Sequence, residues 1–599
     1  MNPADDDPLF PAPRHGGVET LRHDADRETQ PWPLSQRRGA QTGRARASAT
    51  QRRRLLALVI LAIAIAAGFA LRVELIAGKY ELHNDEAFSY IEATGHMNAF
   101  RVATAGGLSA RWVPAERWQS MWQPDAILGM RDIAAALARY DTHPPLYYWI
   151  LHFWLLIVGT HLWSGPVLNL FFSALAGLAL FGLARRLLRQ DVDAALVTLT
   201  WSLSRVVVAT SSLARNYDLL TVLVVLFVWL LVDVSDAQRP PRKLALVALG
   251  VVTAVAFLTH YQFLLAVAGA LVFALGSAWL SGRAGHAQDG HPWRRSASTL
   301  VTMAAGLGLT MLLYPGMFNS FRVARSMQMR PSVETFLGKV DAVVDTVTRA
   351  FGLGTAWLDT LLAGTLPPEH APWLRPSVLL LLAAVAAGVA LLATPRLRRT
   401  VYTRLGPPGA TGLPAIFFAV WLGGAIVAQN LAFMSQPHFM SGRYLSMAWP
   451  FCAFLPLLAF RVLVRRWARL LTLAFCLLLL LPAAVLAPIR YDSRRPTPFP
   501  ALSSADRVVV NTTGPGQLIN ALWSVQGTAL VFADKPEGLL AGSQAWIIPL
   551  AQGDCFAYFI PGPPLPTARC VRRLEKERRL ELVTGSVTVR GAYKVTGPR

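Results

Sequence analysis

Two adjacent acids, Asp85 and Glu86, stand shortly after the first long apolar run, Leu55 to Ala70. Carboxylates at the mouth of a membrane span are costly to keep dry, and they commonly serve function. A carboxylate within about 3 Å of an attacking hydroxyl can take its proton as a general base. In an extended segment the two side chains point in opposite directions. We therefore assign the base to Asp85, and we expect Glu86 to orient substrate or to hold a helix terminus.

Further polar groups gather at the ends of other apolar runs. Arg215 and Arg443 are candidates to bind an anion, because a guanidinium matches the geometry of a phosphate. Each candidate has a structural alternative: a helix start for His143, a snorkelling side chain for Arg215 and a buried structural imidazole for His260. The candidate substrate-binding residues are His143, Arg215, Tyr217, His260, Tyr261, Arg443 and Tyr444.

Metal and nucleotide motifs give no further site. The chain lacks His-Glu-x-x-His, paired Cys-x-x-Cys and a glycine-rich phosphate loop. No cofactor is established. A divalent metal at Asp85 and Glu86 stays open, and its ligand set is unknown.

The composition indicates which class of protein must position these residues. Of 599 residues, 53% are hydrophobic and 15% are charged. Repeated apolar runs predict a polytopic α-helical membrane protein rather than a soluble enzyme. The net charge of +22 comes with arginine clusters between apolar runs. These clusters favour cytoplasmic anchoring over nucleic-acid binding.

Eleven spans follow from the apolar runs, with further helices lying in the interface. They are expected at about 55–77, 166–184, 192–210, 218–234, 243–259, 262–280, 297–317, 376–394, 414–434, 445–462 and 468–489. If Leu146 to Trp163 also crossed, the basic cluster 185–189 would fall outside, so we place this run in the interface. The N-terminus is then cytoplasmic and the C-terminus outside, with every candidate site residue on the outer side.

The same pattern predicts the domain organisation. Residues 1–50 are expected to be a disordered, basic cytoplasmic tail. Residues 51–490 form the transmembrane catalytic domain, with 78–165 as its first outer loop and amphipathic helices in 116–140 and 332–364. Residues 491–599 are expected to be a small extracytoplasmic α/β domain, in which Cys555 and Cys570 could pair. Its short strands are expected at 507–511, 528–533, 546–550, 555–560 and 586–590, with a helical stretch at Gln517–Trp523.

Five ordered motifs on this outer side resemble the GT-C glycosyltransferases. The nearest groups are the bacterial ArnT-like aminoarabinose transferases and the protein O-mannosyltransferases, and the resemblance covers roughly residues 55–490. The motifs are Asp85–Tyr90, His143–Trp149, Leu213–Tyr217, Thr259–Tyr261 and Gly442–Leu445.

The resemblance implies an integral enzyme of the inner membrane. Such an enzyme moves a hexosyl or pentosyl group from a polyprenyl-phosphate carrier to a hydroxyl of a lipid, glycan or protein, typically with inversion. Asp85 matches the first-loop acid that is the family's base, and Glu86 matches the acid beside it. Arg215 and Arg443 become candidates to hold the donor phosphate. The aminoarabinose transferases tend to have a lysine before the paired prolines, where this chain has His143, so their reaction on lipid A is not implied.

Two other classes of function stay open. A lipid or polysaccharide transporter or flippase would show internal repeats and polar, broken helices near mid-membrane. We find no repeat, and the polar groups stand at the ends of the runs. A membrane scaffold or receptor would not need acids and arginines that converge on one face.

Overall fold

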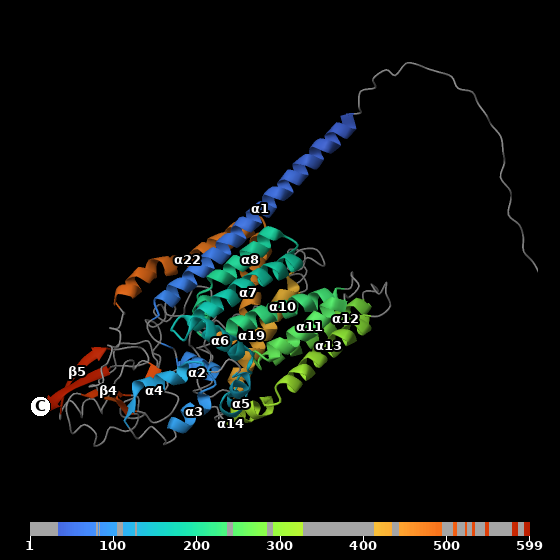
Figure 1. Cartoon of the computed structure of the whole chain (residues 1–599). Helices are drawn as coiled ribbons and strands as arrows, with labels where there is room; N and C mark the ends of the chain where they lie inside the picture. The colour runs from blue at the N-terminus through green and yellow to red at the C-terminus, as the bar shows by residue number, and fades with distance from the viewer. Residues whose placement is uncertain are drawn as a thin grey trace, which may run out of the picture. The chain divides into compact units, whose positions relative to one another are not determined.

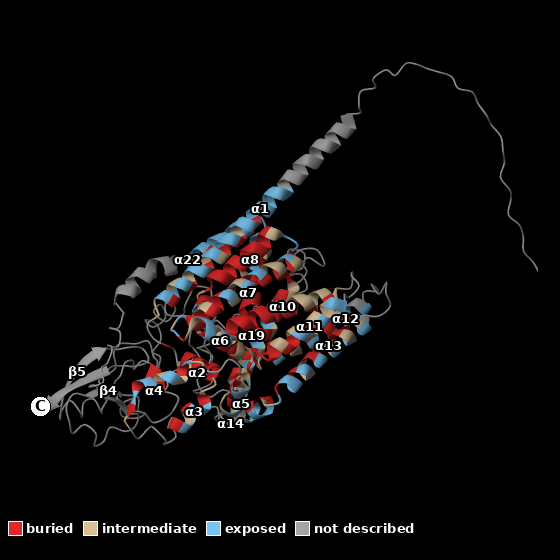
Figure 2. Cartoon of the chain, viewed as in Figure 1, coloured by how far each residue is buried: buried red, intermediate tan, exposed pale blue. Residues whose placement is uncertain are grey.

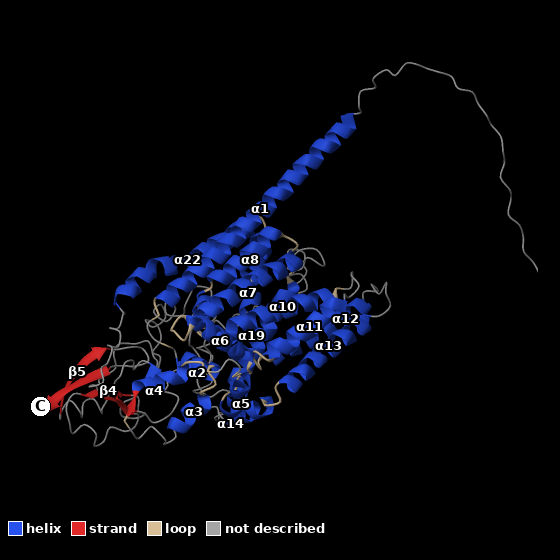
Figure 3. Cartoon of the chain, viewed as in Figure 1, coloured by secondary structure: helices blue, strands red, loops and turns tan. Residues whose placement is uncertain are grey.

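The chain, described here by a computed structural model, is mostly helical, with a small sheet (Figures 1 and 3). It divides into two units, residues 1–53 and 54–599, and the helical core, the sheet and the site all lie within the second. The structure describes residues 34–79, 82, 84–104, 112–125, 129–236, 243–283, 292–326, 394, 412–433, 442–493, 507–511, 522–523, 530–532, 545–549, 578–584 and 592–598.

The first helix, α1 (Leu34–Ala77), begins inside the tail for which we expected no regular structure. Residues 34–50 are rich in Ala and Arg, which are good helix formers, and this explains the difference. The helices between this one and the next long helix, which begins at Ser164, are short: α2 (Asn84–Ala93), α3 (Met97–Val102), α4 (Ala115–Gln119), η2 (Ser120–Trp122), α5 (Met130–Tyr140) and α6 (Leu146–Val158). At 13 residues, α6 is about 20 Å long, too short to cross the ~30 Å hydrocarbon core.

Among the described residues, six helices are long and apolar enough to cross a membrane. They include Thr50–Ala77 of α1, α7 (Ser164–Leu188), α10 (Tyr217–Ser235), and stretches of α12 (Phe263–Arg283), α13 (Pro292–Leu313) and α19 (Leu413–Phe433). A seventh candidate is α8 (Asp191–Leu203) with α9 (Arg205–Ser211), which meet at a bend of 62°.

Shorter apolar helices occupy three further expected spans. These are α11 (Lys243–Phe257), α20 and α21 (Trp449–Cys452, Phe454–Val464), and α22 (Ala468–Ser493), which is apolar over 468–480. The remaining helices are α14 (Met317–Ser326) and η5 (Gly442–Leu445). The span expected at 376–394 and the amphipathic helix expected in 332–364 lie outside the described residues, so the total of eleven stays a prediction.

The helices pack around a buried centre made by α7, α8 and α10. Helix α7 packs against α8 and α10, and α10 against α11, which in turn packs against α13. Figure 2 shows buried residues gathered on α8 and α10, whereas α1 and α13 carry long exposed faces. The exposed faces are apolar, as membrane helices require. The fold class is therefore a polytopic α-helical membrane protein.

Charged side chains pair at the end of α7 and α8 that lies away from Ser164. Asp193, 1% exposed, accepts hydrogen bonds from Arg461 and from Arg469, the latter at 2.6 Å. Arg186 similarly pairs with Asp233 at 2.7 Å. The basic loops expected on one side of the membrane are thus tied together by buried or half-buried acids.

The six-stranded sheet combines the C-terminal region with the first outer loop. Its strand order is β1-β3-β2-β4-β6-β5, with β2 parallel to β3 and β4 and the other pairs antiparallel. The strands are β1 (Val113–Pro114), β2 (Arg507–Asn511), β3 (Leu530–Phe532), β4 (Ala545–Pro549), β5 (Arg578–Thr584) and β6 (Ala592–Pro598). Three expected strands correspond to β2, β3 and β4. Those expected at 555–560 and 586–590, together with Cys555 and Cys570, lie outside the described residues.

Candidate active site

Asp85 and Glu86 lie in the first turn of α2, not in the extended segment that we expected. Acids are favoured there because they stabilise the positive end of the helix dipole. Successive side chains on a helix still diverge, so the two acids face different partners. Glu86 is fully buried, pairs with Lys79, and accepts a hydrogen bond from Ala214 N at 2.8 Å. Glu86 therefore fixes the chain around Ala214, while Asp85 stays partly accessible.

Asp85 faces a second charged group from a distant part of the chain. Its Oδ2 lies 2.6 Å from Nη1 of Arg443 in η5, and the two side chains are 27% and 15% exposed. The Arg443 guanidinium also lies over the Tyr444 ring, 5.2 Å from its centroid. Burial acts to lower the pKa of Arg443, but the Asp85 carboxylate raises it above its ordinary value. Arg443 is thus a permanent cation at the acid end of α2.

The turn that carries Arg215 is built from hydrogen bonds to its backbone. Asn169 of α7 donates from Nδ2 to the carbonyl oxygens of Leu213 (2.5 Å) and Arg215 (3.1 Å). A Cβ on Gly165 would lie 2.3 Å from the Ala214 Cβ, so only glycine lets α7 approach the turn this closely. This turn follows α9 directly, and its backbone leaves the Arg215 side chain in a fixed position.

Arg215 connects the acid helix to the His143 segment. The side chain is 6% exposed, and Nη1 donates to the Asp85 carbonyl oxygen (3.2 Å) and to Ser89 Oγ (3.1 Å). Nη2 lies 3.1 Å from His143 Nε2. Its Nε is buried and has no acceptor among the described residues. Arg215 therefore joins α2 to His143 and still has one N–H for a further acceptor.

The hydrogen-bond roles of the two His143 ring nitrogens follow from their partners. Because Nε2 faces a guanidinium, which only donates, that nitrogen accepts. Nδ1 then carries the proton and donates to Asp141 Oδ1 at 2.8 Å. Burial acts to raise the pKa of Asp141, but the His143 ring beside it holds the pKa of this acid below its ordinary value. A charged Asp141 thus fixes the His143 ring, which in turn orients Arg215.

The other candidates fall into two groups. His260 lies 5.6 Å from His143 and 6.1 Å from Tyr217 between ring centroids, and Tyr217 lies 6.2 Å from Tyr444. Burial, together with the neighbouring charges, lowers the pKa of His260 well below its ordinary value, so this ring is neutral at pH 7. These three aromatic groups join the cluster. Tyr261 instead packs on Phe321, 4.6 Å between centroids, and within the described part of the chain no ring contact joins it to these three groups.

Sequence reasoning missed Glu92, which is 2% exposed. It follows Ser89 by three residues and Asp85 by seven, so all three share one face of α2. Burial and the adjacent Asp141 carboxylate raise the pKa of Glu92 well above its ordinary value, and a protonated Glu92 donates to Asp141. The helical spacing would have identified Glu92 had α2 been predicted as a helix.

The assembled cluster suits an anionic substrate next to an acid. Two arginines from separate segments flank Asp85, and three aromatic groups lie beside them. Within the described residues, no group of three or more His, Cys, Asp or Glu side chains could hold a metal ion. The cluster can therefore bind an anion through guanidinium groups and accept a proton at a carboxylate.

The C-terminal region also reaches α2. Trp523 stacks on Tyr90 with ring centroids 5.6 Å apart, and it lies 5.5 Å from Trp122, edge to face. Trp122 Nε1 donates to the Ala87 carbonyl oxygen at 3.3 Å. Gln119 Nε2 donates to the Leu522 carbonyl oxygen at 2.6 Å. The helix that carries Asp85 is thus supported by residues more than 400 positions later in the chain.

Comparison with known proteins gives one family match. The model of the dolichyl-phosphate-mannose-protein mannosyltransferase family matches residues 142–307, which include His143, Arg215 and His260 but neither α2 nor η5. No curated protein matches the sequence.

Two solved structures of ArnT from Cupriavidus metallidurans are similar over 90% of this chain and 99% of theirs. The one bound to undecaprenyl phosphate has a TM-score of 0.41 at 14% identity, and the apo form 0.37 at 15%. TM-scores below 0.5 carry no assignment for this chain. The family match, by contrast, falls on three of the five motifs and confirms the resemblance of this chain to the GT-C glycosyltransferases.

Proposed function

We propose that this protein is an integral membrane glycosyltransferase that moves a sugar from a polyprenyl-phosphate carrier to an acceptor hydroxyl. The observation that carries the proposal is the position of Asp85 between two cations: its carboxylate contacts Arg443, and its carbonyl oxygen accepts a hydrogen bond from Arg215. The family match supports the donor class, because dolichyl phosphate is a polyprenyl phosphate. The acceptor is a lipid, a glycan or a protein.

In the reaction, Asp85 takes the proton of the acceptor hydroxyl as its oxygen attacks the anomeric carbon. The bond from that carbon to the phosphate oxygen breaks, and the polyprenyl phosphate leaves with the electron pair. Arg215 and Arg443 stabilise the negative charge that grows on this phosphate. A single displacement inverts the anomeric centre. His143, His260, Tyr217 and Tyr444 line the donor site.

Donor binding also prepares the base. Without donor, Arg443 neutralises Asp85 through the 2.6 Å contact. A donor phosphate competes for Arg443, and its arrival leaves the Asp85 carboxylate with fewer donors and hence more basic. Asp85 then becomes a base only when a sugar phosphate is present.

The proposal places the protein in the inner membrane, with the N-terminus cytoplasmic and the C-terminus and the site outside. The half-buried acids that tie the basic loops together lie at the opposite end of the helices from Asp85, as the positive-inside rule requires. A reporter that is active only outside the cytoplasm, fused after Arg599, should be active. An inactive reporter contradicts this orientation.

A lipid transporter or flippase is the second candidate. The observation that favours it is the 62° bend between α8 and α9, because transporters place broken helices beside their substrates. A flippase would move a fluorescent polyprenyl phosphate between leaflets without consuming a sugar donor.

The two candidates separate in one assay. Purified protein in proteoliposomes receives a radiolabelled polyprenyl-phosphate sugar and a membrane extract as acceptor source. Transfer by wild type should fall in Asp85→Asn and persist in Asp132→Asn, a control on the same outer loop in which an exposed acid is neutralised. Leaflet exchange without transfer would replace the transferase by the flippase.

A further inference from the structure

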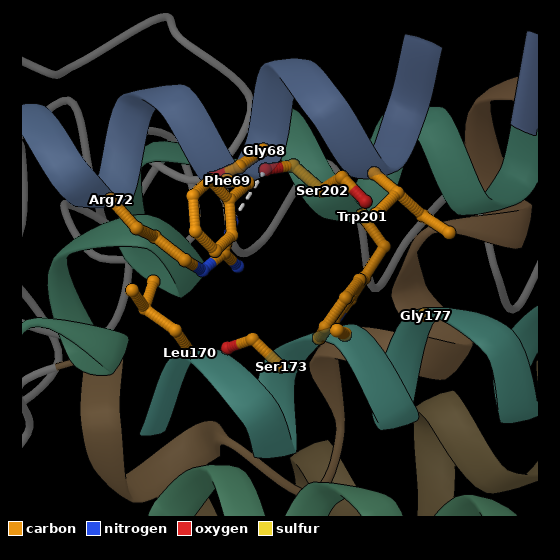
Figure 4. A pocket seen from close by; sticks show the side chains of 10 residues that line it. Gly68, Phe69, Arg72, Leu170, Ser173, Gly177, Trp201 and Ser202 are labelled. Carbon is orange, nitrogen blue, oxygen red and sulfur yellow. Dashed lines mark hydrogen bonds between the residues drawn. The ribbon is translucent and has the colours of Figure 1, made fainter. Parts of the chain in front are cut away.

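A small cavity lies between α1, α7 and α8, and none of the residues that line it belongs to the cluster around Asp85. Ile65, Gly68 and Arg72 line it from α1, Ser173 from α7 and Trp201 from α8. It measures about 20 Å³, enough for one oxygen-bearing group but not for a lipid chain. Figure 4 shows the Arg72 guanidinium pointing into this space, with Ser173 on the facing wall.

Arg72 is a buried cation whose hydrogen bonds all go to neutral groups. Its Nε donates to Ser211 Oγ (3.0 Å), and Nη1 donates to the carbonyl oxygens of Gly68 (2.8 Å) and Ser202 (3.2 Å). Asp218 is reached only through Ser211, whose Oγ donates to it at 3.1 Å. These bonds join α1 to α8 and α9. Among the residues that the structure describes, no carboxylate contacts the guanidinium directly.

Two buried N–H donors at the cavity remain unused. Nη2 of Arg72 and Nε1 of Trp201 have no acceptor among the described residues, and both side chains are 2% exposed. The Arg72 side chain does not reach for the membrane surface, because Nη1 bonds the carbonyl one turn back on α1. The hydrogen bonds that Arg72 makes between helices therefore account for only some of its N–H groups. An oxygen acceptor in the cavity would satisfy the remaining donors.

The location of the cavity identifies the source of that acceptor. Phe69, which also lines it, is 50% exposed on a helix face that meets lipid. Arg72 lies about 13 Å from the middle of the span Thr50–Ala77, close to the ~15 Å half-thickness of the hydrocarbon core. The phosphates of the membrane lipids lie just beyond this boundary, so the bilayer itself supplies anionic oxygens close to the Arg72 guanidinium.

We propose that this cavity takes up one phosphate oxygen of a membrane phospholipid, with Arg72 Nη2 and Trp201 Nε1 as donors to that oxygen and the rest of the phosphate at the mouth of the cavity. The headgroup remains outside the cavity, and the acyl chains lie along Phe69 and α1. This site is separate from the cluster around Asp85 and does not depend on the transferase proposal.

The test counts lipids retained by the delipidated full chain in native mass spectrometry. Phosphatidylglycerol should bind with one tight equivalent. Diacylglycerol, which has the same chains without phosphate, and inorganic phosphate should not. Arg72→Gln should weaken phosphatidylglycerol binding at least about tenfold, because it removes a charge-assisted hydrogen bond. Arg54→Gln, the same change at the other end of the span, should leave the tight equivalent intact.

A second variant tests the proposal independently, in case Arg72→Gln fails to fold. Ala174→Leu fills the cavity from α7 and keeps every Arg72 hydrogen bond, and it should abolish the tight equivalent. Equal binding of phosphatidylglycerol by wild type and Ala174→Leu would overturn the proposal. Binding of diacylglycerol would show that the phosphate is not recognised. Binding of inorganic phosphate alone would show a free-ion site instead of a lipid site.

Discussion

Replacing Asp85 by Asn should change sugar transfer and carrier binding in opposite directions. The substitution keeps the shape of the side chain and removes its charge. Transfer should fall by roughly 10²–10⁴, the usual contribution of a positioned general base. At the same time Arg443 loses the carboxylate 2.6 Å away and becomes free for a phosphate. Binding of polyprenyl phosphate, the reaction product, should therefore become tighter.

The size of the gain follows from the Asp85–Arg443 contact. A hydrogen bond to a charged group contributes about 1.5–3 kcal/mol, and the partial exposure of this pair favours the lower end. Release of about 1.4 kcal/mol corresponds to a tenfold lower Kd. Isothermal titration with polyprenyl phosphate measures this Kd, and the radiolabelled donor assay measures transfer. Arg443→Gln is the matched control, which should weaken carrier binding.

Two results would refute this reasoning. Transfer at the wild-type rate in Asp85→Asn would show that Asp85 is not the base. A weaker affinity for polyprenyl phosphate in Asp85→Asn, as in Arg443→Gln, would show that the two groups do not compete. An unchanged melting temperature in each variant ensures that the comparison concerns folded protein.

Three further variants test the supports of the site. Arg215→Lys should lower transfer at least tenfold despite the retained charge, because an ammonium cannot bond His143 and α2 together; wild-type transfer would contradict the forked contact. Glu92→Gln should be at least as stable as wild type above the ordinary pKa of 4.5, with the difference in melting temperature growing as pH rises, because native Glu92 retains a proton that the unfolded chain releases; a difference that shrinks would show a charged Glu92. Asp193→Ala should cost about 3–5 kcal/mol of unfolding free energy in chemical denaturation, because two arginines lose their buried partner; a loss below about 1 kcal/mol would show that they are solvated.

Most of the helical spans that the structure describes, and the two arginines that lie beside Asp85, were predictable from the sequence, because both depend on local patterns. Apolar runs of sufficient length determine a span, and the expected bounds 218–234 differ from α10 by a single residue at each end. The positions of Arg215 and Arg443 at the ends of such runs marked them as candidates. The structure brings both to Asp85.

What the sequence did not predict depends on long-range pairing. The sequence around Asp85 and Glu86 was interpreted as an extended segment. Helix α2 has only ten residues, which is too short a window for the helical spacing of apolar residues to be recognised. Glu92 was therefore missed. Tyr261 was grouped with His260 because they are adjacent, yet their side chains diverge. No local pattern shows that Trp523 stacks on Tyr90.

The strand pairing between Val113 and Val531 has a consequence for biosynthesis. At about 5–20 residues per second, the ribosome delivers Val531 roughly 20–80 s after Val113. During this interval β1 has no partner, and α2 lacks the ring of Trp523 against Tyr90. Helix α2, which carries Asp85, therefore gains its final packing contacts only near the end of translation. A nascent chain inserted in the bilayer would hold the Asp85 carboxylate on an unfinished support, so under the proposed function transfer would begin only when synthesis is nearly complete.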